Sequence, residues 1–565
     1  MSKLVIKNNI NSELAITHVD NKPAKSIIGT DIAVAVDTIN DFPLDASDGD
    51  AVIVRDLDRG GTFIYDSSKV AEHNDGTNFN GWIRQYSDSI NVKWFGAKGD
   101  GVTDDTQIIQ IVLDYANTNN NIVFIPNGTY MINSTKNGTY YGLMMHDNTY
   151  LILSPNAILK AIPNDSAQYS IIQINNKTNV IIEGGTIEGE RNNHNGTDGE
   201  WGMGIYVSGS NKIIIKDMAI KNCWGDGIYL GMDANNNYSS NIFISNVISD
   251  NNRRQGMSIV SAYNVLVNHS WFTNTNGTPP SAGVDLEPNS LDYPNKEITF
   301  IDCHFINNAG HAVLTGNRNT NYNINFDQCK LVAGHNGWAI WFLTPEKQIS
   351  RFTNCTIKGP CIHLDNVIFD NCFFYHDTNW KQSAYTLSMS DNSFVKFNNC
   401  KIYAKGTRLL YVERSTTKST SKIFNGCKFT TDGDGAGNKN NIIILRGEFY
   451  FSNCIFDHVG TEPADGFIVS ADFSQKAENT WFSPVYRYYN NTQGVSENYG
   501  IASVKDGDTI PHGLFRTPSI VNITTTVENH IASVTSDSTN LTIHLTDNSG
   551  NAITTAENIY WFAKV

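Results

Sequence analysis

Two acidic residues that stand two positions apart are the first candidates for chemistry in this sequence. Asp285 and Glu287 lie in the run Ala282–Asn289, which has the apolar–polar alternation of a β-strand. Side chains two apart on a strand point to the same side, and their Cα atoms lie about 6.6 Å apart. Hydrolysis of a glycosidic bond uses such a pair, with one carboxyl as proton donor and the other as base or nucleophile. The separation lies near the boundary between retaining and inverting pairs and slightly favours inversion.

Two cationic residues precede this strand by about one repeat of the chain. Arg253 and Arg254 can bind acidic sugars or hold a carboxylate in its ionised form. The structural alternative is that the same guanidinium groups brace Asp250 or a neighbouring subunit. Both readings stay open from the sequence.

Two further acids stand beside tryptophans earlier in the chain. Asp226 follows Trp224 by two positions, and Glu200 directly precedes Trp201. Indole faces suit the C–H surfaces of sugars, so the acids are predicted as additional catalytic residues and the tryptophans as substrate contacts. The stretch 188–200 is longer than a turn requires, and we expect it to wall a cleft.

Tyr229 and His311 are candidates for substrate binding or proton abstraction in the same region. For His311 a structural hydrogen bond is the simpler prediction. Trp338 and Trp341 are predicted either as sugar contacts or as anchors at a subunit interface. Outward acids on a repetitive fold are commonly solvated surface groups, which is the alternative for all the acids named here.

A sequence repeat defines the elements that position these residues. Seven of the nine cysteines occupy one slot, with Phe three positions before Cys and an apolar residue two positions after it. These are Cys303, Cys329, Cys355, Cys372, Cys400, Cys427 and Cys454. Most of the intervals are 26 to 28 residues, and a strand-like unit at such a period indicates a solenoid. Free Cys is commonly buried, so we expect a ladder of reduced thiols rather than a metal array.

Short strand patterns repeat with the same period upstream of the cysteines. One set is 227–230, 256–259, 283–286 and 312–315; another is 212–215, 242–244, 265–267 and 298–300. Several short strands per period predict a parallel β-helix whose coils stack about 4.8 Å apart. Alternation then places Val284 and Leu286 in the core, with Tyr229, Asp285 and Glu287 on the outer wall.

The open end of a β-helix must be covered, and residues 104–115 supply a candidate helix. Asp104 is predicted as the N-cap, with Gln107 completing a capping box. The predicted apolar face is Ile108, Ile111, Val112 and Tyr115.

The run Phe95–Gln107 (Phe-Gly-Ala-Lys-Gly-Asp-Gly-Val-Thr-Asp-Asp-Thr-Gln) resembles the entry motif of the pectate-lyase-like right-handed β-helix superfamily. Together with the repeats, the resemblance covers about residues 91–485. The layout is similar to that of phage tailspikes, the capsular polysaccharide depolymerases of phages that infect encapsulated bacteria. That resemblance implies a homotrimer on the virion tail that is made in the host cytoplasm and cleaves host capsule outside the cell. The paired Asp and Arg-x-Lys signature of polygalacturonases is missing, so pectin chemistry does not carry over.

The expected fold class is all-β: a single-stranded right-handed parallel β-helix with an N-terminal cap helix and small β modules at both ends. Residues 1–90 are predicted as the virion-attachment segment, and residues 91–485 as the β-helix with the depolymerase site. Residues 490–565 are predicted as a C-terminal β module for trimerisation or glycan binding. Its strands are expected at 519–523 and at the strictly alternating run 541–545.

Charge and composition exclude several function classes. The formal net charge is −15, which argues against binding to nucleic acid or to an anionic membrane surface. No apolar run approaches the roughly 18 residues of a membrane helix. The first residues turn polar too early for a signal peptide, and nine cysteines without one argue against a disulfide framework. No cofactor and no metal is needed by the predicted chemistry.

Three hypotheses about function therefore stay open. The first is an endo-acting capsule glycosidase that uses Asp285 and Glu287. The second is a polysaccharide lyase in which Arg254 neutralises a uronate and His311 or Tyr229 abstracts the C5 proton. The third is an adhesin that binds glycan without cleaving it.

Overall fold

The computed structural model describes the chain in separate ranges. They are residues 4–7, 13–16, 25–28, 31–135, 138–290, 292–315, 321–344, 348–390, 394–413, 422–432, 443–445, 449–459, 467–471, 475–478, 480–482, 486–489, 495–514 and 516–565. Within these ranges the structure consists mainly of β-strands, with one α-helix, α1 (Thr106–Asn119). The chain divides into two compact units, Met1–Trp224 and Gly225–Val565, and each is described by itself.

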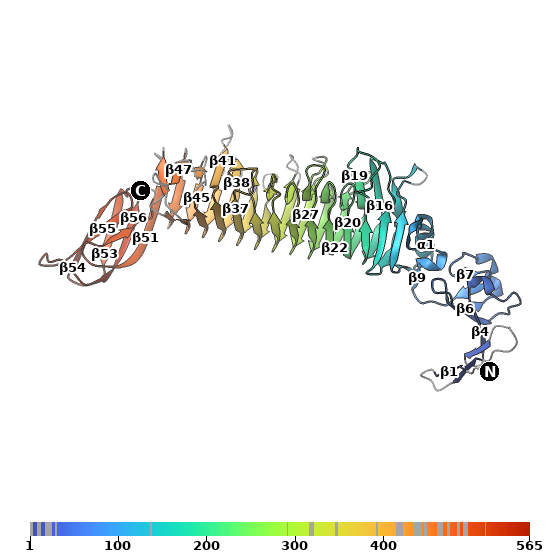
Figure 1. Ribbon diagram of the computed structural model, residues 1–565. Coiled ribbons are helices and arrows are strands. Elements are labelled where there is room, and N and C mark those ends of the chain that lie inside the picture. Colours follow the sequence, from blue (N-terminus) through green and yellow to red (C-terminus); the bar gives the residue numbers. More distant parts are fainter. Residues whose placement is uncertain are drawn as a thin grey trace. The chain divides into compact units, whose positions relative to one another are not determined.

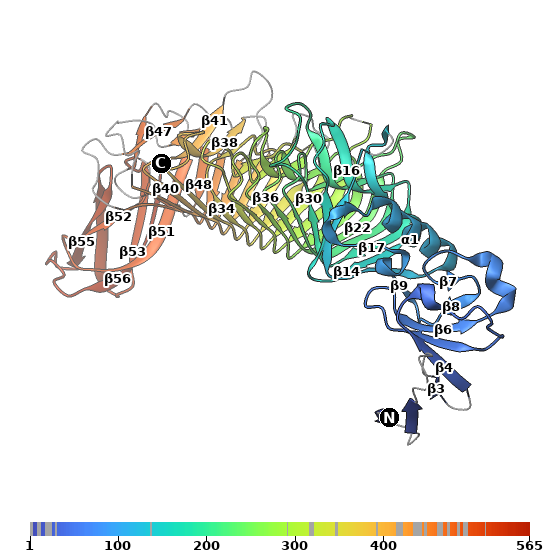
Figure 2. The same ribbon diagram turned by 45° about the vertical axis from the view of Figure 1, so that its right-hand side comes forward.

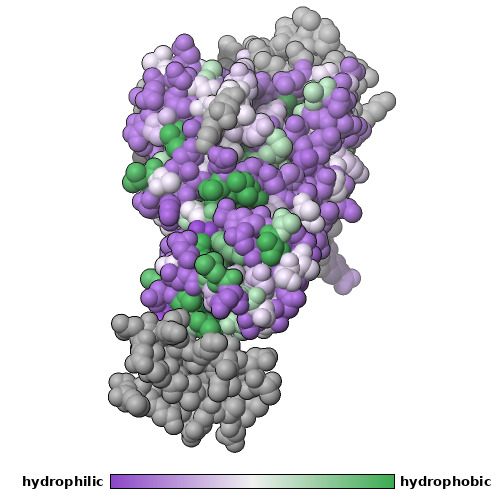
Figure 3. Space-filling view, turned by 90° about the vertical axis from the view of Figure 1, so that its right-hand side faces the viewer, coloured by the Kyte–Doolittle hydropathy of each residue, from purple (hydrophilic) through white to green (hydrophobic). Residues whose placement is uncertain are grey.

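The first unit begins with a small sheet. Its strands lie in the order β3 (Lys25–Ile28), β4 (Asp31–Val36), β5 (Ala51–Val54), β6 (Gly61–Tyr65), β8 (Trp82–Arg84) and β7 (Asn78–Phe79). Val52, Phe63 and Trp82 form its buried core. Leu44 and Leu57 are fully exposed. The face in Figure 3 is mostly hydrophilic, with hydrophobic residues in separate spots.

Helix α1 is the predicted cap helix, but its start and its buried face differ from expectation. The N-cap is Asp105, not Asp104, and the Asp105 side chain makes no cap hydrogen bond, so the predicted capping box with Gln107 is wrong; the Asp104 Oδ1 accepts the backbone N–H of Thr106 at 3.1 Å. The Asp105 carboxylate instead accepts the backbone N–H groups of Lys98 at 2.7 Å and Gly99 at 2.9 Å. This carboxylate is buried, and burial raises its pKa.

The buried face of α1 consists of Ile109, Val112, Leu113 and Ala116. Of the predicted apolar face only Val112 is fully buried; Ile108 and Tyr115 are half-buried, and Ile111 is 42% exposed. The helix packs on the first β-strands of the coil through this rotated face.

The coils of the first unit are built from short strands that pair in parallel with those of the next coil (Figure 2). Strands β11 (Ile122–Ile125), β12 (Gly128–Ile132) and β13 (Tyr141–Met144) pair in parallel with β14 (Tyr150–Leu153), β15 (Ala157–Ala161) and β16 (Gln168–Asn175). The next coil supplies β17 (Thr178–Glu183), β18 (Thr186–Glu188) and β19 (Trp201–Ser208), and β20 (Asn211–Lys221) follows. This is the parallel β-helix that the repeats predict.

The second unit continues with the same architecture (Figure 1). One row of parallel neighbours, called the site sheet below, contains β21 (Ile228–Gly231), β23 (Gln255–Ile259), β26 (Ala282–Leu286), β29 (Val313–Thr315), β32 (Ile340–Trp341), β35 (Cys361–Ile362), β38 (Tyr385–Ser390) and β41 (Arg408–Glu413). A second row contains β22 (Ser239–Asp250), β24 (Ala262–Asn268), β27 (Asn295–Ile301) and β30 (Asn321–Asp327). The strands predicted from both sequence sets fall inside these elements and β20.

The interior of the second unit is a stack of like residues. All seven repeated cysteines are buried, and none forms a disulfide. The Sγ of Cys329 donates to the carbonyl of Phe300 at 3.5 Å, and that of Cys355 to Phe326 at 3.4 Å. The rings of Phe300 and Phe326 stack with centroids 4.8 Å apart, one coil spacing. The predicted thiol ladder is confirmed, and each thiol links its coil to the preceding one.

The C-terminal module is the predicted antiparallel sandwich. Strand β56 (Glu557–Lys564) lies between β51 (Val495–Val504) and β53 (Ile520–Thr525), and β55 (Asn540–Asp547) pairs with β54 (His530–Ser536) and β52 (Thr509–Pro511). Leu541, Ile543 and Leu545 from the strictly alternating run form its core with Ile559. The boundaries of the three predicted segments, 1–90, 91–485 and 490–565, stay predictions.

The Asp105 carboxylate provides a stability test of the cap. Asp105→Ala leaves two partly buried N–H groups without their acceptor and is expected to lower the free energy of unfolding by about 1–3 kcal/mol. Urea unfolding of the full chain measures the change. Asp37→Ala, which removes an exposed acid of the same unit, is the control and should change it by less than about 0.5 kcal/mol. Equal losses in both variants would contradict the role of Asp105.

Candidate active site

One column of side chains runs across the outer face of the site sheet. Tyr229 is in register with Ser258, Ser258 with Asp285, and Asp285 with Leu314. The flanking residues Val284 and Leu286 and their counterparts in the adjacent strands are buried, and all of them except Thr315 are apolar. Since side chains alternate along a strand, the column faces away from the core.

Asp285 lies at the centre of a group of polar side chains. Its Oδ2 accepts a hydrogen bond from Gln255 Nε2 at 2.9 Å, and Gln255 is held in turn by the backbone N–H of Ala282, which donates to its Oε1 at 3.0 Å. Oδ1 is buried, and no N–H or O–H of a described residue donates to it. Asp285 is 1% exposed. A carboxyl in this position is fixed in place but incompletely satisfied.

The pKa of Asp285 is raised well above its ordinary value. Burial is the main cause, because it disfavours the charged form, and the negative charge of the adjacent Glu287 acts in the same direction. Asp226 adds to the rise, while the Arg254 guanidinium opposes it. The arrangement therefore favours a neutral, proton-bearing Asp285 beside an exposed Glu287.

Asp226 and Arg254 form the second part of the cluster. Asp226 is fully buried, and its Oδ2 accepts a hydrogen bond from Ser258 Oγ at 2.7 Å. The Nη1 of Arg254 lies 3.5 Å from the same oxygen, and the Arg254 side chain is 17% exposed. Arg254 thus contacts Asp226, and its positive charge opposes the rise in the pKa of Asp285. The structural partner predicted for it was Asp250.

The alternative that the predicted acids are solvated surface groups is wrong for Asp285 and Asp226, which are buried, whereas Glu287 is exposed. Alternation correctly assigns Asp285 to the outer side of its strand. However, the side chains of Gln255 and Arg254 reach across that side and bury it. Gln255 and Ser258 were not predicted as site residues; the register of Ser258 beside Asp285 was the available signal.

His311 is placed as a structural residue. Its Nδ1 accepts the backbone N–H of Trp338 at 3.1 Å, and burial lowers its pKa to about 4. The neutral ring then carries its hydrogen on Nε2, so neither nitrogen is free to accept a proton near neutral pH. Tyr229 is half-buried in the same column as Asp285 and keeps the geometry of a candidate base or substrate contact.

Of the acids and tryptophans predicted earlier in the chain, Trp201 and Glu200 are accessible to solvent and Trp224 is largely buried. Trp201 is 53% exposed and Glu200 is half-buried, whereas Trp224 is 9% exposed. The Nε1 of Trp224 donates to the carbonyl of Asp198 at 3.4 Å. These three residues belong to the first unit, so their sharing a site with Asp285 stays a prediction, as does substrate contact by Arg253.

A second buried cluster in the first unit was not predicted. The Glu190 Oε1 accepts hydrogen bonds from the Tyr169 hydroxyl and from His194 Nδ1, the latter at 2.9 Å. The His194 ring stacks on Trp224 with centroids 3.9 Å apart. Both Glu190 and His194 lie in the stretch 188–200, which the sequence assigned only as the wall of a cleft. The cluster folds part of that stretch inward.

The described residues contain neither a group of candidate metal ligands nor a candidate membrane-spanning helix. Among the described residues, no three or more His, Cys, Asp and Glu side chains are grouped so that they could hold a metal ion. In the same ranges no helix has both the length and the apolar character needed to span a membrane.

Comparison with known proteins places the fold in a class. Residues 89–336, somewhat less than half of the chain, match the family model described as "Rhamnogalacturonase A/epimerase, pectate lyase-like". The β-helix is thus of the pectate lyase-like, right-handed type that the entry motif predicts.

Two curated relatives come from Bacillus subtilis strain 168. The uncharacterized protein YclG is 31% identical over 253 residues, and the SPbeta prophage-derived uncharacterized protein YorA is 30% identical over 251 residues. Each match covers 40% of this chain and 43% or 42% of the relative, so this chain matches less than half of their length. Among solved structures, the tailspike gp49 of Acinetobacter baumannii bacteriophage Fri1, a capsular polysaccharide depolymerase, is 12% identical with a TM-score of 0.43. That similarity covers 94% of this chain and 98% of the tailspike.

The buried proton of Asp285 is expected to make stability depend on pH. Once the pH exceeds the ordinary Asp pKa of about 3.9, the unfolded chain has lost a proton that the folded chain retains, so stability falls as pH rises through the raised pKa. Asp285→Asn removes this loss, so its melting temperature relative to the unmodified chain should increase from pH 4 to pH 9. Differential scanning calorimetry at one scan rate measures it.

The control for this experiment is Asp292→Asn, which neutralises an exposed acid of the same unit. Its melting temperature should follow that of the unmodified chain at every pH. A pH-independent difference for Asp285→Asn would contradict the raised pKa.

Proposed function

We propose that this chain binds and cleaves a polysaccharide on the outer face of its site sheet by glycosidic hydrolysis. The observation that carries the proposal is the pairing of a buried carboxyl, Asp285, whose pKa is raised, with an exposed carboxyl, Glu287. A buried carboxyl that keeps its proton beside an exposed carboxyl suits the role of acid, and the exposed one suits the role of base or nucleophile. The match to a pectate lyase-like family model supports a polysaccharide as the substrate.

In the proposed reaction the Asp285 carboxyl gives its proton to the glycosidic oxygen as the bond from that oxygen to the anomeric carbon breaks. Glu287 either takes a proton from the water that attacks the anomeric carbon or attacks that carbon itself and is released by water. One water is consumed for each bond cleaved in both cases. Arg254 contacts Asp226 at 3.5 Å beside the reacting pair. Because Asp285 is 1% exposed, substrate entry requires Arg254 or Glu287 to turn aside.

A lyase is the second candidate, favoured by the position of Arg254 among the carboxyls. There Arg254 would neutralise a uronate carboxylate, and an ionised Tyr229 would take the C5 proton while the C4–O bond breaks, the C4–C5 double bond forms and Asp285 gives a proton to the leaving oxygen. The hydrogen bond that occupies His311 Nδ1 argues against His311 as the base. A protein that only binds glycan is the third candidate.

The proposed biological setting is the tail of a phage, where the chain would act on the capsular polysaccharide of the host. The prophage origin of the relative YorA supports this setting. Residues 1–90 would attach the protein to the virion, and the active form would be a homotrimer.

Substitution of the paired acids tests the proposed reaction. Asp285→Asn and Glu287→Gln are each expected to lower cleavage by about 10²- to 10⁴-fold, the usual contribution of general acid–base catalysis. The assay digests capsular polysaccharides purified from a panel of typed strains. New saturated reducing ends indicate a hydrolase, ultraviolet-absorbing unsaturated ends a lyase, and no fragments an adhesin. Asp292→Asn is the control, and full cleavage by both acid variants would rule out this pair.

The C-terminal module provides a test of the trimer. Tyr499, Ile501, Ile520 and Tyr560 are 60%, 62%, 49% and 54% exposed on one face of the β51–β56–β53 sheet. An apolar face of this kind is expected to pack against other copies of the chain. Light scattering should give three times the chain mass of 62.6 kDa.

The variant Ile501→Lys/Tyr560→Lys should reduce that mass to one chain, because the two residues lie directly opposite each other on β51 and β56. Lysine at the exposed Tyr263 of β24 is the control. A single-chain mass for the unmodified protein would contradict the trimer.

A further inference from the structure

The site sheet carries a second candidate binding place beyond the acidic cluster. A pocket of about 210 Å³ opens on β32, β35, β38 and β41. It is lined by Trp338, Ile362, His363, Ser383, Tyr385, Ser388, Met389 and Tyr411. Strand β35 is three strands further along the sheet than β26, and β38 is four. At one coil spacing per strand, the pocket lies about 14–19 Å from Asp285.

The pocket and Asp285 share the same face of the sheet. Leu314, next to Asp285 in the outward column, is in register with Trp341, and Trp341 with Ile362. On the following strands Ser388 is in register with Tyr411. A ligand that extends along this face can therefore contact the acids and the pocket together.

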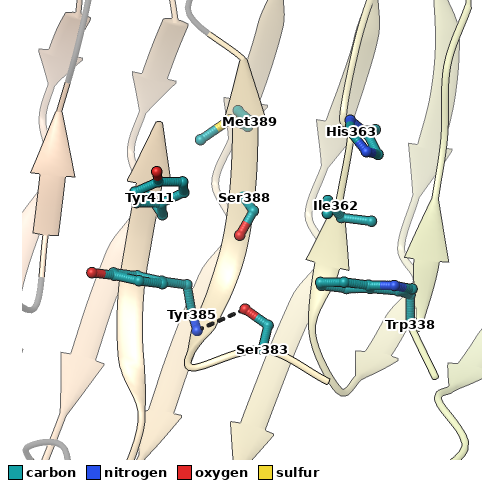
Figure 4. Close-up of a pocket in the computed structure, with 8 residues that line it drawn as sticks. All are labelled: Trp338, Ile362, His363, Ser383, Tyr385, Ser388, Met389 and Tyr411. Carbon is teal, nitrogen blue, oxygen red and sulfur yellow. Dashed lines mark hydrogen bonds between the residues drawn. The ribbon is translucent and has the colours of Figure 1, made fainter. Parts of the chain in front are cut away.

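Aromatic rings form one side of the pocket (Figure 4). The Trp338 and Tyr385 rings are seen edge-on near the start of their strands, while His363 and Met389 lie at the opposite side, with Ile362 and Ser388 between. Tyr385 also lies against Tyr411, with centroids 5.0 Å apart. The rings of Trp338, Tyr385 and Tyr411 contribute apolar surface to the pocket; Trp338 is 6% exposed, and the Arg408 guanidinium lies over the Tyr385 ring.

Hydrogen bonds hold these rings in place before a ligand binds. The Tyr385 hydroxyl accepts from Arg408 Nη1 at 3.0 Å, and the Tyr385 backbone N–H donates to Ser383 Oγ at 2.9 Å. Because these side chains are already ordered, less conformational entropy is lost when a ligand binds. The hydroxyls of Ser383 and Ser388 place polar groups beside apolar surface, and none of the eight lining residues is Asp, Glu, Lys or Arg.

We propose that this pocket binds a neutral pyranose residue of the polysaccharide that Asp285 and Glu287 act on; the identity of the polymer rests on the proposed function. A pyranose has an apolar C–H face for the aromatic rings and hydroxyls at its edge for the serines. The volume is below the range of about 300–1,000 Å³ typical of drug-sized ligands, which fits a single ring. No Asp, Glu, Lys or Arg lines the pocket, and the guanidinium of Arg408 beside it already donates to the Tyr385 hydroxyl and lies over the Tyr385 ring, so a neutral sugar is proposed here. The polymer then runs along the coil axis, and cleavage takes place several sugar residues from the pocket.

Saturation-transfer NMR with simple sugars tests the pocket directly. The probes are the methyl glycosides of glucose, galactose, mannose and N-acetylglucosamine. At least one should receive saturation from the unmodified protein, and Tyr411→Ala and Ser388→Ala should each reduce the signal at least about threefold. Tyr403→Ala, at a half-buried tyrosine of β40 (Lys401–Lys405) outside the site sheet, should leave it unchanged. No transfer from any of the four probes, or transfer unaffected by both pocket variants, would overturn the proposal.

A second experiment separates this inference from the proposed function. In a Glu287→Gln background, adding Tyr411→Ala should weaken binding of the cleaved polysaccharide about tenfold, corresponding to about 1.4 kcal/mol. If Glu287→Gln abolishes cleavage but Tyr411→Ala changes neither polymer binding nor product length, the pocket assignment alone is wrong. If methyl glycosides bind in a Tyr411-dependent way but no polysaccharide of the panel is cleaved, the proposed hydrolysis alone is wrong.

Discussion

The structure depends on the spacing of about 4.8 Å between successive coils, which forces each inward side chain to stack on its counterpart in the next coil. Phe300 and Phe326 meet this condition by stacking, and Cys303 and Cys329 meet it with thiols that donate to carbonyls of the preceding coil. Unlike residues at these positions would leave voids or clashes that recur along the stack. The repeat in the sequence is the direct consequence of this constraint.

The same spacing brings outward side chains within interaction distance. Stacking of like residues stabilises the interior, but like charges on the outer face destabilise it. Asp226 and Asp285 lie on coils separated by β23, and Asp226 raises the pKa of Asp285; Ser258, Gln255 and Arg254 supply donors and one positive charge to these buried carboxyls. The supply is incomplete, since Oδ1 of Asp285 receives no hydrogen bond from a described residue. A carboxyl held in this condition retains its proton more strongly than one in water, which is the property a general acid needs. Local instability and proposed activity thus have one physical origin.

These features differ in how far the sequence could predict them. The strands and the thiol ladder were predicted because period and alternation are read directly from residue types. The start of α1 was not, because Asp104 and Asp105 are equivalent in the sequence; the N–H groups of Lys98 and Gly99 distinguish them. Alternation gave the side on which Asp285 lies but not its burial, which depends on side chains from another coil. The Glu190–His194 pair lies in a stretch without a period, so no pattern placed it.

Alternation also separates stability from recognition along the site sheet. Leu286, Leu387 and Leu410 fill the core, while their neighbours Asp285, Ser388 and Tyr411 face outward. An outward residue can change without altering the inward stack, so charged and aromatic places can occur on different coils of one wall. Each binding site lowers the stability of its own coil only. At one coil the unfavourable term is the desolvation of a carboxyl, and at another it is the ordering of aromatic side chains. A linear polymer suits such a wall because its own repeat lets it contact several coils at once, and affinity then comes from coils that take no part in bond cleavage.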